Sequence, residues 1–548
     1  MLLYIHQSKK IQWIDFWESL FPQNQKEGFI FMKNTVKKLA AVGLTLTTVM
    51  GLVACGSTTD PKATASKEIT KPTGFKVMVD GTVVKETNGA KQFYDYLNTL
   101  NGQLNIEWVR PDHAGYYDAV ANAFNSEDTR PDVVLLSSDY LTLYASNGFL
   151  WDMTDAYNNS ALKASGRLVA GADKLMEALK VGGEDGALAM YGFAPTRGNG
   201  CVTYVKEKWL TDIGMTKADI SGTMNFTTYY EMLKKMAAKE GKTVISSAGF
   251  IGGEVPYTNY LPEFYQQAQY TFYKNSAGQY VDGFTEQAMK DALARIATAV
   301  KDGVLDKGSV AYTTTLARDK WNADASGVFT YWAGAWAETL RANLASKKLD
   351  DSLIAIKPIK ELGTYIERVS PSWAITTKAE NPEGIFKYFL ETMLDGGDIQ
   401  TAWEYGAKGT HWDTKAETVT VQDDKTAGTT YTEGQFHMLP NTETPTVLMS
   451  KNFMDPTLAL GSFPNGDPGK ASIAKIAIDG ENAFNEQSTV ANLLQMTPKL
   501  GAYIVDINKE RNNVIAAVAN GSKTVDEGMT EYNTKVGSLV KEVLESYK

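Results

Sequence analysis

The sequence predicts an α/β protein built from two lobes. Segments typical of buried strands alternate with segments typical of amphipathic helices, which is the pattern of sheets covered by helices. The stretch 191–210 interrupts this series, because Pro195, Gly198 and Gly200 predict a turn and the alternating residues 201–205 predict a strand. A second series of strands and helices follows. We therefore interpret 191–210 as a crossing between two lobes, with a hinge and a ligand cleft beside it.

The first lobe begins after a polar leader. Residues 74–80, 104–110 and 131–139 predict strands, and the last of these is a continuous apolar run, typical of a strand covered on both faces. Residues 91–100 and 116–124 predict the helices between them. In such sheets, ligand groups are expected at the carboxyl ends of the strands. The polar and aromatic residues at those ends are Asp112, His113, Tyr116, Ser138, Asp139 and Tyr140.

Length, charge and cysteine content exclude several classes of protein. A chain of 548 residues can bury two cores. The net charge of -10 argues against nucleic acid or anionic lipid as a partner. Two cysteines, Cys55 and Cys201, exclude a disulfide framework, and the scattered histidines lack the spacing of a metal site. The many Trp and Tyr residues suit stacking on sugar rings, although most aromatic rings belong to cores.

A predicted targeting signal precedes the two predicted lobes. Lys33, Lys37 and Lys38 form a basic region after Met32, and an apolar region over 39–53 ends in Leu-Val-Ala-Cys at Cys55. This segment resembles a bacterial lipoprotein signal, whose cysteine receives a diacylglycerol. The resemblance implies that 32–54 are removed and that Cys55 carries a lipid anchor. The alternatives are an uncleaved anchor, for which the apolar run is short, or a buried helix.

Two flanking segments have separate interpretations. Residues 1–31 do not fit a signal, which should begin at its basic end, and we hypothesise that translation starts at Met32. Peptides from 1–31 in the precursor would contradict this. Residues 55–73 are rich in Ser, Thr, Lys and Pro without an apolar period, so we expect a flexible tether.

Three blocks carry a family resemblance: PDVVLLSSDYLTLYASNGFLWDMTDAY, YGFAPTRGNGCVTYVKEKWLTDIGM and RVSPSWAITTKAENPEGIFKYFLETML. They resemble family 1 extracellular solute-binding proteins, the relatives of maltose-binding protein, and the likeness extends over 74–548. It implies the type II periplasmic-binding-protein fold, in which each lobe is a mostly parallel sheet flanked by helices and the ligand cleft lies between the lobes. The family topology assigns 74–196 and 367–411 to the N-terminal lobe, and 197–366 and 412–548 to the C-terminal lobe.

A further block, TAWEYGAKGTHWD, resembles a signature of large lipoprotein-type members, which include binders of alginate and plant-polysaccharide oligomers. Such members often carry a calcium loop after the helix that begins near Asn225. The stretch AAKEGKTVISSAGF has no acidic array there, so we expect no calcium at that place. The acidic stretch near Asp479 leaves calcium elsewhere open, and no other metal or cofactor is expected.

Aromatic and polar residues near the predicted strand ends form the candidate ligand site. Trp332 and Trp336 are separated by small residues, which suits a loop where rings stand clear of the backbone, and the alternative is a core pair at helical spacing. Asp139 and Arg197 suit bidentate hydrogen bonds to sugar hydroxyls, or else form surface ion pairs. The predicted ligand-binding residues are Asp139, Arg197, Asn199, Tyr257, Tyr260, Trp332, Trp336 and Trp373.

The resemblance implies a membrane-tethered substrate-binding component of an ABC importer. It predicts a monomer on the extracellular face of the bacterial cytoplasmic membrane that binds an oligosaccharide and delivers it to permease subunits. Two alternatives remain: a surface enzyme acting on polysaccharide, which would need two carboxylates across the scissile bond, and a binder of peptides. No nucleophile elbow or Walker loop is found. The arginines Arg110, Arg197, Arg341 and Arg368 leave ligands containing uronate open.

Overall fold

The computed structural model describes residues 68–81, 89–112, 115–168, 176–177, 179–183, 187–195, 198–251, 259–369, 371–419, 428–439, 468, 474–491, 494 and 497–547. The predicted signal, Cys55 and most of the tether lie outside these residues, as do Arg197 and Tyr257. Residues 69–120 and 130–548 form one compact unit, which contains every site discussed below.

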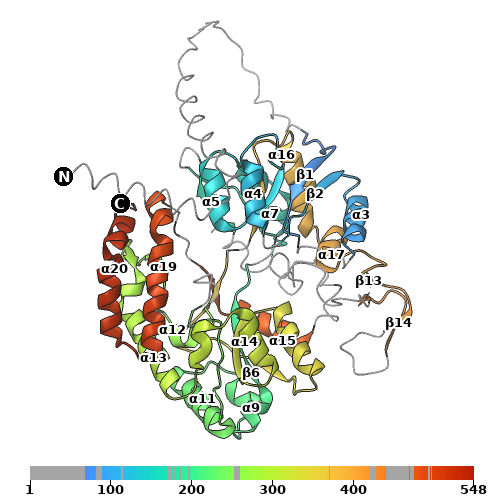
Figure 1. Ribbon diagram of the computed structural model, residues 1–548. Coiled ribbons are helices and arrows are strands. Elements are labelled where there is room, and N and C mark those ends of the chain that lie inside the picture. Colours follow the sequence, from blue (N-terminus) through green and yellow to red (C-terminus); the bar gives the residue numbers. More distant parts are fainter. Residues whose placement is uncertain are drawn as a thin grey trace, which may run out of the picture. The chain divides into compact units, whose positions relative to one another are not determined.

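The first sheet has four strands in the order β12-β3-β1-β2. Figure 1 labels β1 and β2 of this sheet. These are β1 (Phe75–Met78), β2 (Ile106–Val109), β3 (Val133–Leu136) and β12 (Ser372–Ile375). β1 pairs in parallel with β2 and β3, whereas β12 runs antiparallel to β3. The three strands predicted at the start of the chain are therefore confirmed, and the fourth returns from more than 200 residues downstream.

Helices pack around this sheet. They are α3 (Ala90–Leu100), α4 (Tyr116–Phe124), α5 (Ser138–Ser146), α6 (Thr154–Asn158), α7 (Ala161–Ser165), α16 (Pro382–Ile385), η6 (Phe386–Leu390), η7 (Glu391–Leu394) and α17 (Asp398–Tyr405). Asn381 caps α16, because its side chain accepts a hydrogen bond from the Gly384 backbone. Phe389 packs edge-on against Phe75, which joins η6 to the sheet.

The second sheet has three strands in the order β10-β6-β9. These are β6 (Cys201–Lys206), β9 (Val328–Trp332) and β10 (Leu353–Ala355), and both pairings are antiparallel. This differs from the expected mostly parallel sheet. The reason is that β9 and β10 run in the same direction, joined by helix α15 (Ala335–Ser346), while β6 lies between them and runs the opposite way. Parallel pairing is confined here to single bridges from Ile245.

More helices pack around the second sheet. They are α9 (Glu207–Thr211), α10 (Lys217–Ile220), α11 (Phe226–Glu240), α12 (Pro262–Tyr265), η4 (Gly283–Thr285), α13 (Gln287–Lys301), η5 (Lys307–Ala311), α14 (Thr314–Asn322), α18 (Lys475–Asn485), α19 (Pro498–Ala519) and α20 (Val525–Glu545). Asn225 caps α11 through a hydrogen bond from Thr228, as its position before the helix predicts. Gly303, which follows α13, has a φ of 71°, as expected of a helix stop.

Short two-stranded antiparallel pairs accompany these sheets. They are β4 (Lys180–Gly182) with β5 (Leu188–Met190), β7 (Phe272–Lys274) with β8 (Tyr280–Asp282), β13 (Trp412–Asp413) with β16 (His437–Met438), and β14 (Glu417–Val419) with β15 (Thr429–Tyr431). The helices of the described part of the chain are all too short or too polar to span a membrane.

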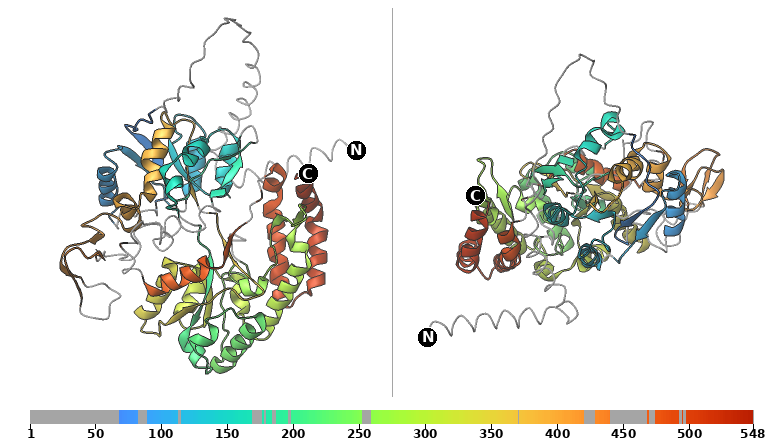
Figure 2. Two further views of the ribbon diagram at one scale, coloured as in Figure 1. Left: turned by 180° about the vertical axis from the view of Figure 1, so that it is seen from behind. Right: turned by 90° about the horizontal axis from the view of Figure 1, so that it is seen from above.

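The helix pair α19 and α20 lies side by side in each view (Figure 1, Figure 2). A buried ion pair attaches the pair to the β7–β8 hairpin: the Arg511 guanidinium lies 2.7 Å from an Asp282 carboxylate oxygen. The other oxygen accepts a hydrogen bond of 2.8 Å from the Tyr532 hydroxyl on α20. Two helices near the C-terminus thus stabilise a hairpin that lies in the middle of the sequence.

The crossing segment is where the predicted hinge lies. β11 (Tyr365–Glu367) pairs in parallel with β17 (Ser488–Val490) and leads from the second sheet back to β12. The outgoing chain runs beside it, because the Gly198 backbone donates to the Glu367 carboxylate and the Arg368 backbone donates to Asn199. A Cβ at Gly200 would lie 2.4 Å from the Ile366 carbonyl oxygen, so only glycine fits this approach. The predicted crossing is confirmed.

Candidate functional site

The two predicted tryptophans lie on different elements. Trp332 ends β9, Trp336 lies in the first turn of α15, and Gly334 between them adopts a φ of 72°. The alternative of one helical core pair is therefore wrong. Both rings are partly buried, and Trp336 meets Tyr331 edge-on with 5.2 Å between ring centroids. Tyr331 also stacks on the predicted site residue Tyr260 at 6.1 Å, so two predicted aromatic residues, Trp336 and Tyr260, meet through Tyr331.

Two arginines cover these rings. The Arg318 guanidinium lies 5.1 Å from the Trp336 ring centroid, and that of Arg368 lies 5.0 Å from the Trp332 centroid. Such contacts hold a guanidinium over an aromatic face while its N–H groups remain in its plane. Arg341, in contrast, pairs with the carboxylates of Glu338 and Asp351. We name Tyr260, Tyr331, Trp332, Trp336, Arg318 and Arg368 the aromatic–arginine cluster.

The carboxyl end of β3 presents a second aromatic group. Asp139 is exposed in the first turn of α5, and the neighbouring Tyr140 stacks on Tyr117 at 4.5 Å and 12°. Burial raises the pKa of Tyr117, whereas its hydrogen bond with Ser137 and the positive charge of Arg368 lower it. Arg368 is therefore within electrostatic range of this strand end, at which we predicted ligand groups.

Two other predicted ligand-binding residues are buried and make contacts within the protein. The Trp373 ring is fully buried and packs edge-on against Phe389 and Trp403 at 5.6 and 5.8 Å, so we assign it no contact with ligand. Asn199 is also buried, has a φ of 63°, and donates from its amide to the Ala333 carbonyl oxygen. Its side chain ties the crossing to the end of β9. Arg197 and Tyr257 lie outside the described residues, so their predicted roles stay predictions.

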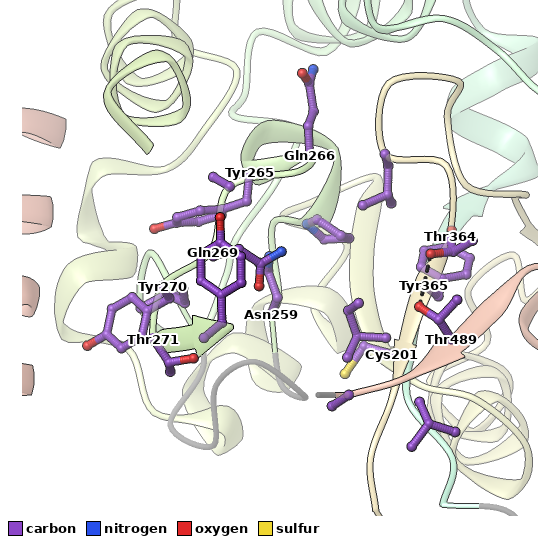
Figure 3. Close-up of a pocket in the computed structure, with 18 residues that line it drawn as sticks. Cys201, Asn259, Tyr265, Gln266, Gln269, Tyr270, Thr271, Thr364, Tyr365 and Thr489 are labelled. Atoms are coloured by element: carbon purple, nitrogen blue, oxygen red, sulfur yellow. Dashed lines mark hydrogen bonds between the residues drawn. The ribbon is translucent and has the colours of Figure 1, made fainter. Parts of the chain in front are cut away.

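A pocket of about 460 Å³ lies beside the crossing strands. Figure 3 shows two facing groups of side chains, one from the segment after α12 and one from β11, β17 and the residue before β11. The first group includes Tyr265, Gln269 and Tyr270, and the second includes Thr364 and Thr489. A volume of this size is ordinary for a small-molecule site. We name this space the crossing-strand pocket.

The pocket adjoins the aromatic–arginine cluster. Cys201 lines the pocket and is the direct cross-strand partner of Trp332. Directly opposed residues of an antiparallel pair place their side chains on the same face of the sheet, so the Trp332 ring neighbours this wall. Asn259, another lining residue, immediately precedes Tyr260 of the cluster. The two features are thus parts of one region around the crossing.

A buried acid lies on the protein side of this region. Glu263 in α12 is 1% exposed, and burial raises its pKa to about 7, although the Thr203 hydroxyl of β6 donates to it at 2.7 Å. Thr203 also contacts the Thr330 hydroxyl of β9 at 2.7 Å. These hydrogen bonds connect α12, which contributes to the pocket wall, to strands β6 and β9 of the second sheet.

The described histidines bond to neighbouring protein groups. His437 is buried against Glu417 at 3.0 Å, and His411 accepts a hydrogen bond from the Ala407 backbone. Within the part of the chain that the structure describes, no group of three His, Cys, Asp or Glu side chains could hold a metal ion. The site as described offers rings, hydroxyls, amides and guanidinium groups, which are groups that can bind a polar ligand.

A family model described as bacterial extracellular solute-binding protein matches residues 84–395, which is more than half of the chain. The protein belongs to this family. The family binds solutes and is not enzymatic. Its members are two-lobed α/β proteins, and the two sheets joined by crossing strands confirm that fold here. No curated protein sequence matches the chain significantly.

Solved structures share the fold at low sequence identity. A family 1 extracellular solute-binding protein from Alicyclobacillus acidocaldarius is 15% identical with a TM-score of 0.55, covering 86% of this chain and 99% of its own. An alginate-binding protein without calcium is 16% identical with a TM-score of 0.54, covering 87% and 97%. An HMO-binding, ABC-transporter-associated solute-binding protein from Bifidobacterium longum infantis is 13% identical with a TM-score of 0.56, covering 87% and 98%.

Sequence reasoning missed the crossing-strand pocket, because none of the predicted ligand-binding residues is among those that line it. Of the segment EVPYTNYLPEFYQQAQYTFY it selected Tyr257 and Tyr260, whereas Asn259 and Gln269 of the same segment line the pocket. The density of amide and phenol groups in this segment was the available signal. Thr364 and Thr489 gave none, because they meet only when β11 and β17 pair.

Proposed function

We propose that the protein is the membrane-tethered substrate-binding component of an ABC importer and that it binds an oligosaccharide. The observation that carries this proposal is the crossing-strand pocket, which lies against the strands that join the two sheets and adjoins the tryptophan rings of the aromatic–arginine cluster. A ligand there contacts the hinge directly. Flat rings suit the faces of sugar rings, and hydroxyl and amide groups suit their edges.

The mechanism follows from the position of this region. The two sheets are joined through the strands of the crossing, so a change of backbone angles at a few residues there moves one lobe against the other. A ligand that contacts the second sheet and the carboxyl end of β3 together would stabilise the closed arrangement. We propose that this closed form is what the permease recognises, and that the lobe boundaries follow the family topology given above.

Other members of the fold support a sugar as the ligand. Structures with the same fold include a sugar transporter from Arthrobacter chlorophenolicus with bound laminaribiose and a MalE3 of T. maritima with bound maltose. A thermal-shift screen of the full chain against oligosaccharides and short peptides tests the proposal. A ligand at one hundred times its Kd adds about 2.7 kcal/mol to stability. A response to peptides alone would overturn the sugar, and turnover of a labelled oligosaccharide would instead reveal an enzyme.

Trp336→Ala is expected to weaken oligosaccharide binding about tenfold, because an aromatic stack contributes about 0.5–1.5 kcal/mol beyond the area that it buries. Isothermal titration calorimetry with the sugar found in the screen measures the change. Tyr503→Ala is the matched control, since Tyr503 lies on α19 and bonds to Glu542 away from the cluster. Equal affinities of parent and Trp336→Ala would remove the cluster from the site.

Cys55→Ala is expected to release the protein from the membrane, because the proposed anchor is a lipid on this thiol. The measurement is the distribution of the protein between membrane and soluble fractions of bacterial cells. Cys201→Ala is the control, since Cys201 is buried in β6. Retention of the Cys55→Ala variant in the membrane fraction would contradict the lipid anchor.

A further inference from the structure

We infer that the crossing-strand pocket selects a neutral, hydroxyl-rich saccharide, with the Gln269 amide as a determinant of this specificity. This inference rests on the proposed function and narrows its ligand class, for which the sequence leaves uronate open. It concerns the enclosed pocket rather than the flanking aromatic–arginine cluster.

Charge is the first argument. The pocket is lined by 18 described residues, and none of these is Asp, Glu, Lys, Arg or His. A carboxylate or sulfate transferred from water into such a pocket loses hydration and gains no opposite charge. Two buried acids near the pocket are not lining residues: Glu263 bonds to the Thr203 hydroxyl, and Glu367 bonds to the Gly198 backbone. The walls therefore disfavour an anionic ligand and a cationic one alike.

The polar groups present are those that a neutral sugar uses. Thr364 and Thr489 bring their hydroxyl oxygens to 3.2 Å of each other on the wall formed by β17 and the start of β11. Across the pocket, Gln269 belongs to the other group of side chains, and its amide lies on the side of that group that faces Thr364 and Thr489 (Figure 3). Its only described hydrogen bond is a long one of 3.4 Å to the Gln267 carbonyl oxygen. An amide can donate and accept at once, which matches vicinal hydroxyls.

The backbone of the lining residue Gln266 gives a second argument that this pocket is a functional site. Gln266, another lining residue, has φ 53° and ψ -121°, a conformation that favours glycine. Strained backbone of this kind persists where the surrounding fold imposes it, and it gathers at functional sites. Here the unusual turn ends α12 and starts the segment that carries Gln269 and Tyr270 into the pocket wall. The α19 helix holds that segment, because the Tyr270 hydroxyl donates to Asn512 at 2.9 Å.

The test compares ligands and variants on the full chain by titration calorimetry. The neutral probes are maltotriose, cellotriose and laminaritriose, and the acidic probe is trigalacturonate. Gln269→Leu removes the amide and keeps the approximate size, and Thr364→Val removes a hydroxyl without a change of shape. Gln287→Leu is the matched control, because Gln287 is exposed on α13 and bonds to Asp291. Each pocket variant is expected to weaken binding of a neutral trisaccharide by about tenfold, since it leaves ligand hydroxyls unpaired.

The outcomes separate the inference from the proposed function. Binding of a neutral probe that both pocket variants weaken and the control does not supports the inference. If only trigalacturonate binds, the inference of a neutral ligand is wrong and the proposed function stands. The same conclusion holds if a neutral trisaccharide binds both pocket variants as tightly as it binds the parent. Absence of binding to every saccharide, with a response to peptides, overturns the proposed function itself. Melting curves of each variant establish that a loss of affinity is not a loss of fold.

Discussion

Replacement of Asp282 by alanine is expected to lower the free energy of unfolding by about 3–5 kcal/mol. Arg511, which is fully buried, would lose the carboxylate 2.7 Å away and keep its charge in the interior. The Tyr532 hydroxyl would lose its acceptor at the same time. Urea denaturation followed by circular dichroism measures the change. The large effect reflects the buried, unpaired charge rather than the attraction between the two groups.

A surface ion pair of the same helices provides the control. Lys535 of α20 lies 2.9 Å from Glu510 of α19, and its side chain is 44% exposed. Lys535→Ala is expected to cost no more than about 1 kcal/mol, because water screens the pair. Comparable losses for Asp282→Ala and Lys535→Ala would show that the buried pair does not anchor the helices. The Asp282 variant should also weaken saccharide binding, since Arg511 packs on the ring of Tyr270 in the pocket wall.

Glu263→Gln is expected to stabilise the protein at pH 8 by about 3 kcal/mol and to leave its stability at pH 4 nearly unchanged. Burial raises the pKa of Glu263 from an ordinary 4.5 to about 7 in the folded protein. The folded state therefore binds the proton more tightly than the unfolded state. The resulting stability is fully present below about pH 4.5 and is lost as the pH rises through 7. Glutamine has no charge to lose and keeps an acceptor for Thr203.

Unfolding free energies of parent and variant between pH 4 and pH 8.5 measure this difference. The parent is expected to lose stability relative to the variant across that window, and the gap should close at the acidic end. A gap that is the same at every pH would show that the substitution acts through packing rather than ionisation. Because Glu263 is fastened to the strands beside the pocket, the same titration should weaken ligand binding at alkaline pH.

The sequence by itself predicted the class of the protein and the order of its elements. Period and composition placed β1, β3, α4 and the crossing at Cys201, because the spacing of apolar residues is a local property of the sequence. The family resemblance followed from the same local blocks. Two of the aromatic residues selected from the sequence, Trp336 and Tyr260, both contact Tyr331 in the structure, and their contact with ligand stays a prediction.

Only the tertiary structure decided what depends on residues far apart in the chain. The residues adjacent to Trp373 do not reveal whether its ring is exposed or buried. The pairing of β12 with β3 buries the ring against Phe389 and Trp403. Thr364 and Thr489 become one wall through the pairing of β11 with β17, and Arg511 reaches Asp282 across more than 200 residues. Local patterns encode secondary structure because its hydrogen bonds are local. Burial, pocket walls and charge pairing arise between distant segments, so they appear only in the folded chain.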